Sequence, residues 1–286
     1  MATSLKNPAA GPDPSAPDRP RDAVVNAFAG GLLELVQRAQ GGHRAGLESL
    51  LLAAAVDRSH AGTVIDLGAG VGAVGLTIAA RCPEARIVLV DRDGRALACA
   101  GAALKRPANR TFADRVEVRQ ADVDGPDLRG LNRSVADLVV ANPPFHVAAD
   151  RGCSPDPARR AAHVLGKTGL QPWIESMEML LKSGGAAILI TASGRLDQVM
   201  RFMEHGFGGI DLLPVQGRPG RPASRVLVRA VKGSRAPVRL FPPLVLHGER
   251  GPAYLHQIEK VLRGRAGLSD VCPGWRRKGA ITEDDP

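Results

Sequence analysis

The stretch ADLVVANPPFHVAAD, residues 136–150, places a carboxamide, two prolines and an aromatic ring directly after an apolar run. These four residues are Asn142, Pro143, Pro144 and Phe145. Proline lacks an N–H donor and fixes φ, so the carbonyl groups of such a turn remain as acceptors on a rigid frame. An asparagine side-chain oxygen and a proline carbonyl can together accept both hydrogens of a planar –NH2 group.

Accepting both hydrogens localises the lone pair of the nitrogen, which makes the poorly nucleophilic amine of a base or amide more reactive. Phe145 can stack on a planar substrate, as aromatic side chains do with unstacked bases. We therefore take Asn142, Pro143, Pro144 and Phe145 as candidate catalytic residues. The structural alternative is a proline loop with Phe145 in the core.

The second motif, VIDLGAGVG at residues 64–72, runs from an apolar strand into a glycine turn. Gly68, Gly70 and Gly72 permit backbone conformations and a close ligand approach that a Cβ would block. The turn therefore predicts contact with a nucleoside-bearing cofactor. Together with Ala73 it also satisfies the dinucleotide-binding pattern G-x-G-x-x-G/A, so NAD remains an alternative.

Three carboxylates favour S-adenosylmethionine over NAD. Asp91 closes the second strand about twenty residues beyond the glycines, where it can accept from both hydroxyls of a ribose, a location that fits NAD as well as S-adenosylmethionine. Asp66 precedes the glycines, where it would repel a pyrophosphate but suits a cationic amine. Asp122 follows the third strand and can accept from an adenine amino group. Alternatively, Asp91 caps the helix beginning at Asp93, and Asp122 only solvates a loop.

An alternation of apolar strands with helices must position these residues. Such alternation predicts an α/β fold with parallel strands and crossover helices, and burial of both faces explains the nearly continuous apolar runs. The expected strands are 63–67, 85–90, 115–120, 135–141 and 186–191, and the expected helices are 47–56, 73–82, 93–105, 170–181 and 195–205.

The end of this pattern differs, because residues 209–215 and 225–231 are two strands joined by a loop too short for a crossover helix. They must pair antiparallel. Outside the repeating part, we expect a short strand at 32–37 and a weak helix at 254–262. We divide the chain into a disordered tail (1–22), a hairpin and helix extension (23–60), a catalytic domain (61–235) and a C-terminal extension (236–286).

Charge and composition limit the functional classes. The net charge is +9, and from Pro214 onward 14 Lys and Arg stand against six Asp and Glu. Seven basic residues and no acidic one lie between Arg218 and Arg239. This run predicts either a phosphate-facing surface or a plain solvated face. Cys82, Cys99, Cys153 and Cys272 are too widely spaced for a zinc site or disulfide framework.

The N-terminus contains prolines and no apolar h-region, so it predicts a disordered tail rather than a signal peptide. No apolar stretch approaches the roughly 20 residues that span a bilayer. We therefore expect a cytoplasmic protein with no membrane partner and no metal.

In their order and spacing, DLGAGVG, VDRD, QADV and NPPF resemble the class I S-adenosylmethionine-dependent methyltransferases that act on exocyclic amines. Three further segments are similar to the small-domain group that includes the bacterial tRNA(Val) adenine N6-methyltransferases: GHRAGLESLLLAAAV, SPDPARRAAHV and FPPLVLHGERG. The resemblance covers roughly residues 28–265. Glu48 stands where the group has Asp, and Phe145 replaces the Tyr of some members.

The resemblance implies a Rossmann-like, doubly wound, seven-stranded sheet with an antiparallel last strand. It also implies that Asp66, Gly68 and Gly70 contact the methionine part of S-adenosylmethionine, Asp91 the ribose and Asp122 the adenine. The neighbouring residues Ala69, Arg92 and Val123 complete the expected cofactor-binding set.

The leading hypothesis is methyl transfer to the exocyclic amine of a base in RNA, with adenine in tRNA as the favoured substrate. Related alternatives are a guanine amine in ribosomal RNA and a glutamine side chain in a protein. From other classes, an NAD-dependent oxidoreductase and a catalytically silent RNA-binding scaffold remain. The loop 147–166, with Arg159, Arg160 and His163, either folds over the substrate or is a plain surface loop.

Overall fold

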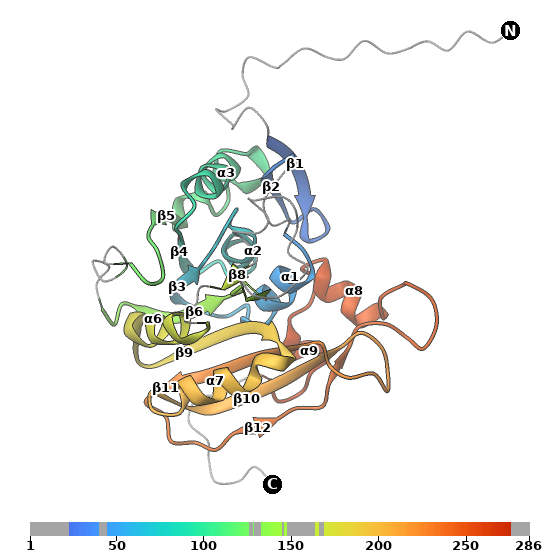
Figure 1. Cartoon of the computed structure of the whole chain (residues 1–286). Helices are drawn as coiled ribbons and strands as arrows, with labels where there is room; N and C mark the ends of the chain where they lie inside the picture. The colour runs from blue at the N-terminus through green and yellow to red at the C-terminus, as the bar shows by residue number, and fades with distance from the viewer. Residues whose placement is uncertain are drawn as a thin grey trace, which may run out of the picture.

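The computed structural model describes residues 23–39, 45–125, 128, 133–144, 146–147, 164–165 and 169–275. The predicted tail at 1–22, Phe145 and most of the loop 147–166 lie outside these residues. Within the described part, a central sheet carries helices on both faces, as the sequence pattern predicts for an α/β fold and the resemblance implies for a Rossmann-like one (Figure 1).

Nine strands of the described chain form the central sheet, in the order β12-β10-β11-β9-β6-β3-β4-β5 with β13 also paired to β10. Their bounds are Gly62–Leu67 (β3), Ala85–Asp91 (β4), Val116–Gln120 (β5), Ala136–Ala141 (β6), Leu181–Ala192 (β9), Phe207–Gln216 (β10), Arg225–Lys232 (β11), Arg239–Leu240 (β12) and Leu244–Val245 (β13).

The expected count of seven strands was wrong, because β12 and β13 add to the sheet. Each has two residues, too few to produce a periodic pattern, and each forms only through backbone pairing with the edge strand β10. The other seven strands follow the prediction. β11 is antiparallel to both β9 and β10, so the short loop between β10 and β11 has the predicted consequence.

Helices cover the two faces of the sheet. The helices on one face are Leu47–Ala54 (α1), Ala73–Arg81 (α2) and Gly94–Leu104 (α3). Those on the other face are Gln171–Leu180 (α6) and Leu196–Met203 (α7). The C-terminal extension contains His256–Leu262 (α8) and Leu268–Val271 (α9). Each face has its own cluster of buried apolar side chains, since successive strand residues point to opposite faces. The four-residue helix α9 has no periodic signal in the sequence.

A hairpin precedes the sheet and is fixed by one buried asparagine. The hairpin strands are β1 (Ala23–Phe28) and β2 (Leu33–Arg38), paired antiparallel. Asn109 is fully buried, and its side chain accepts from Glu34 N at 3.0 Å and donates to Glu34 O at 2.8 Å. It also donates to Ala103 O at 2.8 Å. Asn109 thereby connects β2 to the end of α3.

The C-terminal extension returns to the start of the sheet through Trp275, whose side chain is 1% exposed. Its indole N–H donates to Ala55 O at 3.1 Å, across 220 residues of sequence. Arg229 donates to the carbonyl oxygen of Trp275 at 3.0 Å. These bonds fix the end of the described chain against α1 and β11.

Two short strands, β7 (His146–Val147) and β8 (Val164–Leu165), pair in parallel beyond β6. None of the helices in the described ranges is both long and apolar enough to cross a membrane. Cys82, Cys99 and Cys272 are buried and in the thiol form, and Cys153 lies outside the described residues.

Replacing Asn109 with Leu should lower the free energy of unfolding by about 3 kcal/mol, because three backbone groups lose their hydrogen-bond partner. Chemical denaturation measures this change. Asn26→Leu, at an exposed position of β1, is the matched control and should change stability by less than about 0.5 kcal/mol. Equal stability of the two variants would show that Asn109 does not anchor the hairpin.

Candidate active site

The pairing register of the sheet brings the two motifs to one edge. Leu67, the last residue of β3, pairs in parallel with Val90 of β4 and with Ala141 of β6. Gly68 and Asn142 are therefore the first residues beyond the pairing on neighbouring strands. We call the edge formed by the carboxyl ends of β3, β4, β5, β6 and β9 the catalytic edge; in open α/β sheets, ligands bind at this edge.

The glycine turn projects from β3 in a conformation that favours glycine. Gly68, Gly70 and Gly72 have φ values of 73°, 58° and 81°. The backbone N–H groups of Gly68 and Ala69 both donate to Val90 O, at 2.8 and 2.9 Å, which fixes the turn to β4. A Cβ built at Gly70 meets no atom within 4 Å, so the outer side of this residue is open to a ligand.

Asp91, at the end of β4, faces this turn. One carboxylate oxygen accepts from Gly70 N at 2.7 Å and the other from Asp93 N at 2.8 Å. Burial raises the pKa of Asp91, and the two N–H donors oppose that shift. The cap of α3 is Asp93, which accepts from Arg95 N, so Asp91 is not needed for capping and the capping alternative was wrong.

Asp66 lies inside β3 with 1% of its surface exposed. Its carboxylate accepts from Gly75 N, in the first turn of α2, at 2.8 Å. Burial raises the pKa of Asp66 to about 7, the Gly75 N–H opposes this shift and the charge of Asp91 adds to it. A cation bound close to Asp66 would favour its ionised form.

The far end of the catalytic edge is more open. Asp122 follows β5 and lies 3.8 Å from Arg92 in an ion pair whose side chains are 47% and 58% exposed. Exposed pairs of this kind contribute little to stability. Because its side chain is half-exposed, the Asp122 carboxylate is accessible to a ligand. The carbonyl oxygen of Val123 accepts from the Ser176 hydroxyl of α6 at 3.0 Å, so the helix positions this loop.

Asn142 carries the clearest chemical signal at the edge. Its side-chain oxygen Oδ1 is buried and has no hydrogen-bond donor among the described residues. Leaving a buried acceptor unpaired costs about 1–3 kcal/mol, so such an atom points to a donor supplied by a ligand. Pro143 is buried and Pro144 is half-buried beside it. Phe145, the predicted stacking ring, lies outside the described residues.

Sequence reasoning missed two residues of this site. Trp173, in the first turn of α6, packs its indole ring against the glycine turn: a Cβ at Gly68 would lie only 2.4 Å from the ring. The hydroxyl oxygen of Thr191, near the end of β9, is buried without a partner in the described chain. Trp173 is one of two tryptophans, but its helix was predicted only as an element.

Glu48, which stands where the resembling group has Asp, forms a partly buried ion pair. Glu48, in the first turn of α1, accepts from Arg225 of β11 at 2.5 Å, and its side chain is 13% exposed. Arg225 pairs with Ala192 at the end of β9. The ion pair therefore holds the start of α1 beside the catalytic edge.

Comparison with known proteins agrees with this architecture. The family model described as methyltransferase small domain matches residues 46–210. A solved structure from Agrobacterium tumefaciens, described as a predicted O-methyltransferase, superposes with a TM-score of 0.66 at 30% identity, covering 77% of this chain and 98% of its own.

Two curated relatives carry the name tRNA1(Val) (adenine(37)-N6)-methyltransferase. The protein from Aeromonas hydrophila is 28% identical over 192 residues, which cover 66% of this chain and 77% of the relative. The protein from Porphyromonas gingivalis is 32% identical over 158 residues, covering 54% of this chain and 60% of the relative.

The buried carboxyl of Asp66 predicts a pH dependence of stability. Below pH 3.8 it is protonated in both the folded and the unfolded chain; as the pH rises to about 7, the unfolded chain releases the proton and the folded chain retains it. This group therefore favours the folded state at low pH, and its contribution is lost as the pH rises through about 7.

Asp66→Asn keeps an acceptor for Gly75 N but cannot ionise. As the pH rises from 5 to 8, the free energy of unfolding of the variant minus that of the wild type should increase by roughly 2–3 kcal/mol, since one pKa unit corresponds to about 1.4 kcal/mol. Denaturation of both proteins across this range measures the difference. A stability difference that does not change with pH would contradict the raised pKa.

Proposed function

The chain belongs to the methyltransferase small domain family, and we propose that it transfers a methyl group to the exocyclic amine of an adenine in tRNA. The enzyme is an S-adenosylmethionine-dependent methyltransferase. Its acceptor and the roles of individual residues are the subject of the proposal. The observation that carries it is the buried oxygen of Asn142 at the catalytic edge, which has no hydrogen-bond partner among the described residues.

The residues around the glycine turn fit S-adenosylmethionine. Gly70 leaves open space beside its backbone, and Asp91 presents a carboxylate at the same turn, suited to ribose hydroxyls. Asp66 adds a carboxyl whose ionised form a cationic amine would stabilise, and Asp122 adds an accessible acceptor for an adenine amine. When bound, S-adenosylmethionine supplies a methyl group on a positively charged sulfur.

On the acceptor side, Asn142 is the residue that binds and orients the amine. Its buried oxygen accepts one N–H hydrogen, and the carbonyl of Pro143 accepts the other, which directs the nitrogen lone pair towards the methyl group. Phe145 stacks on the ring of the base. Most of the rate enhancement then comes from positioning and from acceptors fixed before the reaction begins.

The choice of adenine in tRNA rests on the two curated relatives, whose names specify that substrate. Five basic residues after Pro214 bind groups of the protein itself: Arg218, Arg225, Arg229, Lys232 and Arg239. Other basic residues of this part, including the exposed Arg221, Arg235 and Arg250, suit an RNA partner, because each neutralised phosphate releases counterions. With tRNA as the proposed substrate, we also propose a cytoplasmic location. The description of the Agrobacterium structure favours a second candidate, an oxygen acceptor.

Asn142→Ala should lower kcat for methyl transfer on the order of 100-fold, because the variant removes a buried acceptor that is fixed before the reaction begins. The affinity for S-adenosylmethionine, measured by calorimetry, should stay within about twofold, since Asn142 contacts only the amine. Asn26→Ala, an exposed asparagine on β1, is the matched control. A variant with normal kcat would remove Asn142 from the mechanism.

The substrate itself can be identified directly. The enzyme is incubated with labelled S-adenosylmethionine and total RNA from a strain that lacks it, and the nucleosides are analysed by mass spectrometry. We expect N6-methyladenosine in the tRNA fraction. A methylated guanine amine in ribosomal RNA, a methyl group on oxygen or label only in protein would each overturn the proposed acceptor.

A further inference from the structure

The catalytic edge continues past β9 to a pair of loops. β9 and β10 are both antiparallel to β11, so they run in the same direction and the end of β10 lies at the same edge as the end of β9. The two loops, residues 217–224 and 246–255, follow β10 and β13. We call them the loop pair.

Hydrogen bonds join the loop pair to the catalytic edge and to each other. Ser193, which follows β9 directly, donates its N–H to Ser224 O at 3.1 Å and its hydroxyl to Ala223 O at 2.6 Å. Arg218 donates to Gly248 O at 2.7 Å and to Gly251 O at 2.6 Å. Arg218 therefore has a structural role, and the loop pair is a connected extension of the site.

An aromatic pair of half-buried His247 and exposed Tyr254 lies on this extension. His247 and Tyr254 form an antiparallel bridge, and their rings stack with centroids 4.5 Å apart and planes inclined by 21°. Tyr254 is 40% exposed and is the one aromatic among the large apolar side chains exposed in the described chain. The protein holds only nine aromatic residues, so exposing one at the end of the catalytic edge needs a reason.

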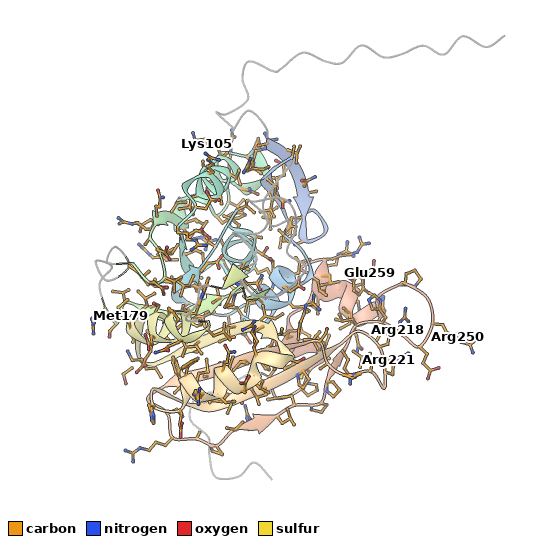
Figure 2. All side chains as sticks on the ribbon, in the orientation of Figure 1. Lys105, Met179, Arg218, Arg221, Arg250 and Glu259 are labelled. Carbon is orange, nitrogen blue, oxygen red and sulfur yellow. The ribbon has the colours of Figure 1, made fainter. Side chains whose placement is uncertain are left out.

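The surroundings of this pair are basic. Arg221 and Arg250 are exposed on the two loops, and Glu249 is the acidic residue of these loops. Glu259 of α8 lies on the same side and pairs with Arg263 at 2.7 Å (Figure 2). Figure 2 shows Arg218, Arg221 and Arg250 together at one side of the molecule, far from Lys105. Arginines beside an exposed ring are the combination that binds single-stranded nucleic acid, with the ring stacking on a base and the cations facing phosphates.

We propose that the loop pair is a second RNA subsite, in which Tyr254 stacks on an unpaired base outside the methylated nucleotide and Arg221 and Arg250 bind the adjoining phosphates. The inference rests on the proposed function, since it takes the same RNA as its ligand. Asn142 on β6 and the end of β10 are three strands apart, about 14 Å at the usual strand spacing, so one RNA segment can reach both.

The test measures binding of a fluorescently labelled tRNA(Val) transcript to the full-length enzyme by anisotropy, together with steady-state methylation. Tyr254→Ala should raise Kd and KM for the RNA about 5- to 150-fold, since stacking on one base is worth about 1–3 kcal/mol. The value of kcat at saturating RNA should remain within about twofold. Tyr254→Phe retains the ring and should restore binding.

Charge is tested separately. The double variant Arg221→Ala/Arg250→Ala should weaken binding and reduce the slope of log Kd against log salt by about one to two. Lys105→Ala removes an exposed cation at the far end of α3 and should change neither quantity. Tyr254→Leu keeps an apolar side chain without a ring. Comparing its RNA affinity and the melting temperatures of both variants with those of the wild type shows whether Tyr254→Ala loses affinity because the protein is destabilised.

Failure of this inference and failure of the proposed function give different results. If the wild type methylates RNA and Tyr254→Ala and Tyr254→Leu bind and react like it, the loop pair is not a subsite. If both variants lose RNA affinity while the wild type transfers no methyl group to RNA, the subsite stands and the proposed function falls. If the double arginine variant binds RNA as tightly as the wild type, Arg221 and Arg250 do not contact the phosphates.

Discussion

The parallel pairing of β3 with both β4 and β6 is the interaction on which the whole site depends. It aligns Leu67 with Val90 and Ala141, so the glycine turn, Asp91 and Asn142 emerge at one edge. A shift of one residue would turn Asp66 from the α2 face to the opposite face, because side chains alternate along a strand. Ile65 and Leu67, on either side of Asp66, are buried in one apolar cluster and Val64 is buried in the other, which fixes the register.

This register has an energetic cost at Asp66. A carboxyl with 1% exposure and a pKa near 7 is a poor choice for stability, and its single backbone donor does not offset the burial. Natural proteins place such groups where ligand binding needs them. The side-chain oxygens of Asn142 and Thr191, which have no partner within the described ranges, lie at the same edge, so three unfavourable buried groups are concentrated at neighbouring strands.

The sequence predicted the seven long strands because most are largely apolar runs bounded by turn residues and β5 alternates Val116 and Val118 with polar residues. The loop between β10 and β11 was short enough to decide their direction. It could not predict β12 and β13, which depend on an available strand edge rather than on their own residues. The same limit applies within the site. The contact of Trp173 with the glycine turn and the ion pair between Glu48 and Arg225 both join segments that are distant in the sequence, so no local pattern predicts either of them.

The contact between Trp275 and Ala55 also has a consequence for biosynthesis. Ala55 leaves the ribosome 220 residues before the tryptophan that covers it, about 10–45 s at ordinary rates of translation. During that interval the apolar surface beside α1 has no cover. The nascent chain therefore passes through a stage in which its catalytic edge can already form while its opposite side remains a target for chaperones and for aggregation.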